Sequence, residues 1–98
     1  MAVPILIPTA LRGYTAGRDR VEAEGRTVGE LLANLAERFG ELRRHLFDDQ
    51  GQLRSFVNVY VNDEDFRYLE RERTPVGERD VVSIVPSIAG GQVEWSPR

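Results

Sequence analysis

Residues 81–91 constrain the fold most, because a β-branched run, a proline and a glycine pair follow one another there. The run from Val81 to Val85 predicts a buried strand, since Val and Ile have stiff side chains that pack well on a pleated sheet. Pro86 has no N–H to give to a neighbouring strand and marks the end of pairing. Beyond it, Gly90 and Gly91 lack side chains and can enter a channel too narrow for a Cβ. The stretch therefore predicts a globule that holds a projecting carboxyl-terminal arm.

The first half of the chain predicts two strands followed by a helix. Residues 1–8 are apolar and β-branched, and residues 18–24 alternate apolar with charged side chains, which is typical of an antiparallel pair exposed on one face. Thr27 and Glu30 match a capping box, and Gly40 fits the position after a helix end. The apolar stripe between them has helical spacing and comprises Val28, Leu31, Leu32, Leu35 and Phe39. A second short helix is expected over residues 41–47.

The second half predicts the rest of an α+β fold. In the strand expected over residues 54–62, Val57, Val59 and Val61 would face the core, and Phe56, Asn58 and Tyr60 the other side. A turn at 62–65, a short strand at 66–69 and polar connections at 70–80 would lead into the final strand. That strand, apolar on both faces, should lie centrally beside the first. The order predicts a β-grasp roll, a mixed sheet of about four to five strands with one main helix across it, spanning residues 1–89 with the arm.

Composition places the 98-residue chain among single soluble domains, with 41% hydrophobic and 30% charged residues. Its apolar runs are far shorter than the roughly 20 residues of a membrane span, and its N-terminus lacks the basic region of a signal peptide. A cytoplasmic location without membrane partners is expected. The net charge of −3 argues against nucleic-acid binding. The absence of cysteine excludes disulfides and thiol chemistry.

Catalytic and metal-binding constellations are not apparent in the sequence. The single histidine, His45, is best explained as a surface or helix-end residue, and the acidic stretch 63–65 lacks the other ligands of a calcium loop. We expect this chain to have no catalytic residues, no metal and no cofactor of its own. Phe56 and Tyr60 are the candidate partner-binding aromatics, although packing against neighbouring strands explains them as well.

Two segments carry a resemblance to a known family. Residues 56–65 (FVNVYVNDED) and 84–91 (IVPSIAGG), in this order of elements, resemble the ubiquitin-like sulfur carriers of the MoaD/ThiS superfamily, most of all the branch that serves cysteine synthesis. The resemblance covers residues 3–91. It implies a carrier protein that partner enzymes act on, not a catalyst.

The resemblance also assigns roles to the arm. An ATP-dependent, ubiquitin-activating-type enzyme would adenylate the terminal glycine, and sulfur would then displace AMP to give a thiocarboxylate. Gly91 would carry the sulfur, with Gly90 as its slim neighbour, while Ile88 and Ala89 would lie in the partner's channel. In the cysteine branch, the acceptor is an activated serine held on a pyridoxal-phosphate sulfhydrylase.

The chain departs from the family pattern after the glycine pair. Members of the family typically end there, whereas this chain continues over residues 92–98. With that extension attached, Gly91 has an amide instead of a free carboxylate. We therefore predict a precursor that a zinc peptidase of the JAMM type cuts between Gly91 and Gln92. The ATP, pyridoxal phosphate and zinc that these steps require would all belong to partner enzymes.

Three alternatives remain open on the sequence. The chain could be the small subunit of molybdopterin synthase, recognised by stable co-elution with a larger subunit. It could donate sulfur for thiamine, tRNA thiolation or a secondary metabolite. It could also be a noncovalent interaction module that keeps its extension, in which case Gly91→Ala would be harmless.

Overall fold

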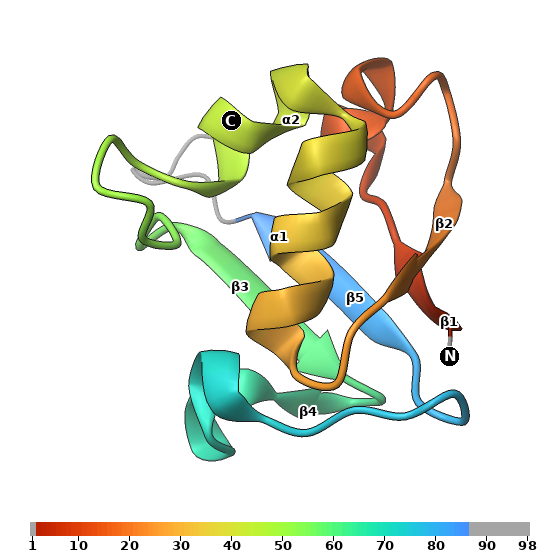
Figure 1. Ribbon diagram of the computed structural model, residues 1–98, viewed down its shortest axis with the longest axis vertical. Helices are drawn as coiled ribbons and strands as arrows, with labels where there is room; N and C mark the ends of the chain where they lie inside the picture. Colours follow the sequence, from red (N-terminus) through yellow and green to blue (C-terminus); the bar gives the residue numbers. More distant parts are fainter. Residues whose placement is uncertain (1, 87–98) are drawn as a thin grey trace, which may run out of the picture.

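The computed structural model describes residues 2–86 as a mixed five-stranded sheet with the main helix packed across it (Figure 1). The strand order is β2-β1-β5-β3-β4. The strands are β1 (Ala2–Leu6), β2 (Arg20–Glu24), β3 (Val57–Val61), β4 (Glu64–Asp65) and β5 (Val82–Pro86), and the main helix is α1 (Val28–Arg38). The predicted β-grasp roll is confirmed.

The final strand lies in the middle of the sheet, as the sequence predicted. β5 runs parallel to β1, with Ile5 opposite Val82, and antiparallel to β3, with Val59 opposite Ile84. β1 and β2 pair antiparallel, with Val3 opposite Ala23. Because β1 and β5 are parallel, both end at the same end of the sheet.

Helix α1 begins at its predicted N-cap. The Glu30 N–H donates to Thr27 Oγ1 at 3.2 Å, and the Glu30 carboxylate accepts from the Arg26 N–H at 2.9 Å, one residue before the usual capping-box position. The helix ends as predicted, with Gly40 directly after the C-cap, but the predicted left-handed conformation of Gly40 is wrong. Phe39 is the C-cap, with its N–H bonded to Leu35 O, and Gly40 opens the second helix α2 (Gly40–Leu46) without a positive φ. The helices therefore meet at a bend through Phe39, with no left-handed residue between them.

The core lies between α1 and one face of the sheet. It combines the apolar stripe of α1 with inward-facing strand residues and two leucines of α2: Val28, Leu31, Leu32, Leu35, Val3, Ile5, Val21, Val57, Val59, Val82, Ile84, Leu42 and Leu46. The predicted inward direction of the three valines of β3 is confirmed, since all are buried. Burying this stripe is what holds α1 on the sheet.

The connections differ from the prediction around β4. The short strand expected over residues 66–69 is the 3₁₀ turn η2 (Phe66–Tyr68), and strand pairing occurs earlier, at Glu64 and Asp65 within the predicted turn. The cause is local, because the Asp65 carboxylate accepts from the Arg67 N–H and caps η2. Two further 3₁₀ turns, η1 (Thr9–Tyr14) and η3 (Arg71–Arg73), occupy segments expected to be irregular.

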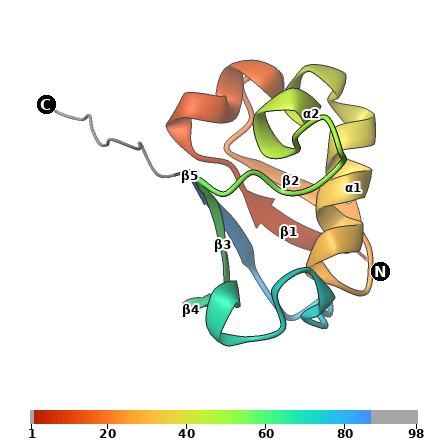
Figure 2. The ribbon, with the colours of Figure 1, turned by 90° about the vertical axis from the view of Figure 1, so that its left-hand side faces the viewer.

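The two faces of the sheet are covered differently. Figure 2 shows both α helices on one side, whereas no helix of residues 2–86 covers the opposite face of β3 and β5. We refer to this opposite side as the outer face. Among these same residues, no helix combines the length and apolar character needed to cross a membrane.

Candidate functional site: the outer face at the base of the arm

The predicted arm residues lie outside the described part of the chain. These are Ile88, Ala89, Gly90, Gly91 and the processing position Gln92. Their roles stay predictions. What the structure fixes is the base of the arm, where Pro86 ends β5 opposite Val57 of β3. The described part of the chain therefore ends in the middle of the sheet, beside the start of β3.

A patch of five residues crosses the outer face beside this base. Leu6 and Tyr60 lie on either side of Ser83, and Asn58 lies opposite Val85. Leu6 is 39% exposed and Val85 is 43% exposed, while the other three are half-buried. These five residues, Leu6, Asn58, Tyr60, Ser83 and Val85, are called the outer patch below. Its exposed aliphatic groups give a binding partner apolar surface to cover.

Of the outer patch only Tyr60 was a predicted partner-binding residue, and the two exposed aliphatic members, Leu6 and Val85, were not expected on this face. The sequence suggested that the final strand is buried on both faces, but only Val82 and Ile84 are buried, and Val85 is exposed. The prediction of a first strand over residues 1–8 gives Leu6 no binding role. Strand alternation places both on the face opposite Ile84 and Ile5, but only the structure shows that Ile84 and Ile5 are the buried side chains.

The two predicted aromatic residues are placed differently. Tyr60 is half-buried and alternates with the buried valines of β3, so it lies on the outer face as predicted. Phe56 precedes the strand, which begins at Val57 and not at Arg54. The Val57 N–H donates to Arg54 O at 3.0 Å and closes a turn there. Phe56 is 40% exposed in this turn, beside the base of the arm.

An ion-pair network borders the outer patch at β4. The Asp65 side chain is 9% exposed and accepts from Arg67 Nη2 at 2.8 Å and from Asn58 Nδ2 at 2.9 Å. The Arg67 side chain, followed by the Asn58 amide, holds the pKa of the Asp65 carboxyl far below its usual range. Asp65 therefore stays ionised and fixes the orientation of Asn58 within the patch.

Metal or acid–base chemistry gains no support from residues 2–86. No three His, Asp or Glu side chains in this range are grouped so that they could hold a metal ion. Asp65, from the acidic stretch, is already engaged by Arg67 and Asn58. His45 lies in the last turn of α2 and stacks on Tyr14 with ring centroids 4.2 Å apart.

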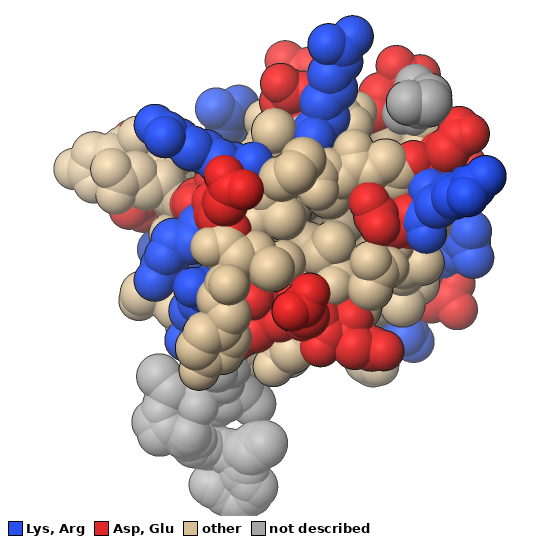
Figure 3. All heavy atoms as spheres, turned by 90° about the horizontal axis from the view of Figure 1, so that it is seen from below, with Lys and Arg blue, Asp and Glu red and all other residues tan. Residues whose placement is uncertain are grey.

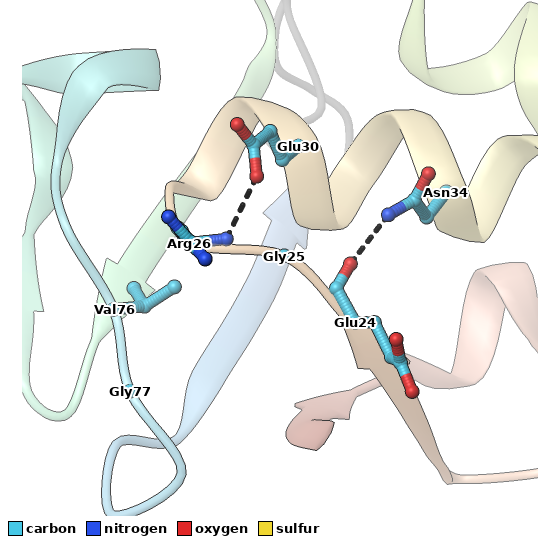
Figure 4. A pocket seen from close by; sticks show the side chains of 7 residues that line it. All are labelled: Glu24, Gly25, Arg26, Glu30, Asn34, Val76 and Gly77. Atoms are coloured by element: carbon cyan, nitrogen blue, oxygen red, sulfur yellow. Dashed lines mark hydrogen bonds between the residues drawn. The ribbon is translucent and has the colours of Figure 1, made fainter. Parts of the chain in front are cut away.

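A hollow of about 430 Å³ lies away from the outer patch, where β2 ends and α1 begins. Figure 4 shows its lining, in which Glu30 accepts from the Arg26 backbone and Asn34 donates to the Glu24 carbonyl. Seen from this end, acidic and basic side chains surround an uncharged centre (Figure 3). The Glu30 carboxylate, the Asn34 amide and the Glu24 carbonyl of the lining therefore already have partners within the chain.

The chain is similar to known proteins over nearly its whole length. The model of the ThiS family matches residues 5–91. The sulfur carrier protein CysO of Mycobacterium tuberculosis is 40% identical over 93 residues, covering 93% of this chain and all of that protein. A putative sulfur carrier protein of Archaeoglobus fulgidus is 34% identical over 91 residues, again covering 93% of this chain and all of the relative.

Solved structures agree with these relatives. CysO in the BexX/CysO complex of Amycolatopsis orientalis superposes with a TM-score of 0.81 at 40% identity, covering 92% of this chain and all of that chain. CysO of M. tuberculosis superposes with a TM-score of 0.78 at 38% identity, covering 88% and 99%. The β-grasp fold is thus shared with proteins of the same size.

Proposed function

The chain belongs to the ThiS family of ubiquitin-like sulfur carriers, and from this membership we propose that it carries sulfur on Gly91 for cysteine biosynthesis. Such carriers are substrates of other enzymes and not enzymes themselves. The observation that carries the proposal is the identity of 40% to CysO over 93 residues. The family match also continues to residue 91, the second glycine of the pair.

The chemistry begins with removal of the extension. Hydrolysis of the Gly91–Gln92 bond by a zinc peptidase of the JAMM type would release residues 92–98 and give Gly91 a free carboxylate. One carboxylate oxygen then attacks the α-phosphate of ATP, and pyrophosphate leaves. The acyl-adenylate is a good electrophile, so a sulfur nucleophile displaces AMP and leaves a thiocarboxylate.

Sulfur delivery would follow on a pyridoxal-phosphate sulfhydrylase. The thiocarboxylate sulfur would replace the leaving group of an activated serine, forming a C–S bond that joins cysteine to Gly91 as a thioester. The peptidase would then release cysteine by hydrolysis. ATP, pyridoxal phosphate and zinc are held by the partners in this scheme, and this chain contributes the reactive carboxyl group and the surface that positions it.

The outer patch is our proposed docking surface for the activating enzyme. It lies on the face of β3 and β5 that no described helix covers, and β5 leads directly into the arm. A partner that covers Leu6, Tyr60 and Val85 would hold the base of the arm at a fixed distance from its active site. That a carrier of this kind binds a protein partner is supported by CysO of Amycolatopsis orientalis, which was solved in a complex with BexX.

The family match also favours a second candidate. The model that matches residues 5–91 is that of the ThiS family, and its description does not refer to cysteine synthesis. Delivery of sulfur to an acceptor other than the cysteine pathway is therefore our alternative. The acceptor enzyme would make that choice, and Gly91 would carry the sulfur in both cases.

Reconstitution distinguishes these possibilities. The chain truncated after Gly91 and converted to the thiocarboxylate is mixed with O-phosphoserine and the sulfhydrylase, and the intact mass is followed. We expect a carrier–cysteine adduct, whereas the full-length chain under the same conditions stays unchanged. A thiocarboxylate that forms but never yields the adduct would reject the cysteine branch. Failure of the activating enzyme to form any thiocarboxylate on the truncated chain would reject the carrier function itself.

A further inference from the structure

The outer edge of β2 has backbone groups that point away from the sheet. Pro4 lies opposite Glu22 and has no N–H, so this pair cannot exchange the two hydrogen bonds of a bonded antiparallel pair. By alternation, the backbone groups of Glu22 and its neighbours Arg20 and Glu24 point to the open side. The Ile7 N–H, bonded to Asp19 O at 2.9 Å, continues the same alternation beyond the strand. β2 thus has a free edge of the kind that pairs with another strand.

Two side chains of α1 occupy acceptors of this edge. Asn34 Nδ2 donates to Glu24 O at 2.5 Å, and Arg38 Nη1 donates to Glu22 O at 2.5 Å. Figure 4 shows how Asn34 reaches from the helix to the end of the strand. A neighbouring strand would donate its N–H groups to these two carbonyls. The two side chains therefore compete directly with strand addition.

We propose that the outer edge of β2 is a pairing site for a second copy of this chain, which Asn34 and Arg38 keep closed. Antiparallel pairing about a two-fold axis at Glu22 puts Arg20 opposite Glu24 of the second copy, and the same pair recurs on the other side of the axis. Opposite charges in such cross-strand positions are stabilising, whereas the two Glu22 side chains that meet on the axis repel each other. The register thus has two attractive Arg20–Glu24 pairs against one repulsive Glu22 pair, and this charge order gives a net preference for a second copy.

The opposite edge of the sheet is less suited to pairing. β4 has only two residues, so it offers a much shorter ladder than the five residues of β2. Pairing through β2 would also leave the centre of the sheet untouched, because β1 separates β2 from β5. The base of the arm would remain accessible in each copy. The proposed pairing is therefore independent of sulfur transfer.

The experiment compares Asn34→Ala/Arg38→Ala with the wild-type chain by sedimentation equilibrium. We expect an 11.1 kDa wild-type monomer. In the double variant, removing the competing side-chain donors should lower the dissociation constant of the dimer by at least about tenfold. Asn34→Gln/Arg38→Lys keeps donors at both positions and should behave more like the wild type. Hydrogen exchange on the double variant should show slowed exchange of the Glu22 and Glu24 amides at high protein concentration only.

A third variant tests the surface itself. Glu22→Pro added to the double variant removes an outward-pointing N–H that β1 does not use, so it should abolish the dimer while β1 and β2 stay paired. The proposal is overturned if the double variant remains as monomeric as the wild type. It is equally overturned if the dimer forms without protection of the Glu22 and Glu24 amides. A wild-type chain that already pairs through β2 would refute the closing role of Asn34 and Arg38.

Discussion

Truncating the two exposed aliphatic side chains of the outer patch should weaken activation of the carrier. Complete burial of a leucine or valine side chain contributes ~1.5–3 kcal/mol. Leu6 and Val85 are about two-fifths exposed, at 39% and 43%, so a partner that covers them would gain about 0.6–1.2 kcal/mol from each. The double variant Leu6→Ala/Val85→Ala should therefore lose about 1.2–2.4 kcal/mol of binding, or roughly 7- to 60-fold in Kd.

The assay uses the chain truncated after Gly91 and the activating enzyme with ATP. Pyrophosphate release at varied carrier concentration gives KM and kcat, and calorimetric titration gives Kd. We expect KM to rise by the factor above with kcat nearly unchanged, because the patch lies on the sheet and not on the reacting carboxyl group. Urea unfolding of the same variant measures how much of the effect comes from the fold.

Tyr68→Ala is the matched control. Tyr68 is 85% exposed on η2, beyond the edge strand and outside the outer patch, and its loss should leave KM unchanged. An unchanged KM for the Leu6→Ala/Val85→Ala variant, in a chain that folds normally, would show that the partner does not cover this surface. A KM that rises equally for Tyr68→Ala would show that the contact is not confined to the outer patch.

Three further predictions concern the fold. Leu35→Ala should lower the free energy of unfolding by about 2–5 kcal/mol in urea, because Leu35 is fully buried between α1 and the sheet; a loss near zero would contradict that packing. Asp65→Asn should destabilise the fold at neutral pH. Because the Arg67 hydrogen bond lowers the pKa of Asp65 from 3.8, the stability advantage of the wild type over this variant should be complete above pH 3.8 and decrease below it. A stability difference that stays constant from pH 7 to pH 2 would refute the network. His45→Phe should raise the melting temperature, because it keeps the ring stack on Tyr14 and removes a buried Nε2 without a partner. A lower melting temperature would show that this nitrogen has a hydrogen-bond partner in the folded protein.

The secure parts of the sequence prediction rest on local signals. The start of α1 follows from the Thr27 hydroxyl and the helical stripe behind it, both of which act within a few residues. The alternation of β3 gives its buried face in the same way. The position of Gly40 after the helix was right, but its left-handed conformation was mispredicted, because a glycine after an apolar stripe is also compatible with a bend between two helices. β4 was missed because its two paired residues are polar and resemble a turn.

The candidate site was only partly accessible from the sequence. The glycine pair and the strand before it indicate the carrier family, since these residues must be small and must follow a strand. The outer patch could not be assembled in the same way. Leu6 and Val85 are far apart in the sequence, and only the parallel pairing of β1 with β5 brings their strands together.

The sequence by itself determined the order of elements, the capped helix, the central place of the last strand and the family. Each of these depends on periodicity and on short-range chemistry that neighbouring residues carry. The tertiary structure alone decided which face of the sheet stays uncovered, so that Val85 is exposed while Ile84, beside it, is buried. The reason is that α1 can bury its one apolar stripe against only one face of the sheet, and the aliphatic side chains on the other face remain available to a partner.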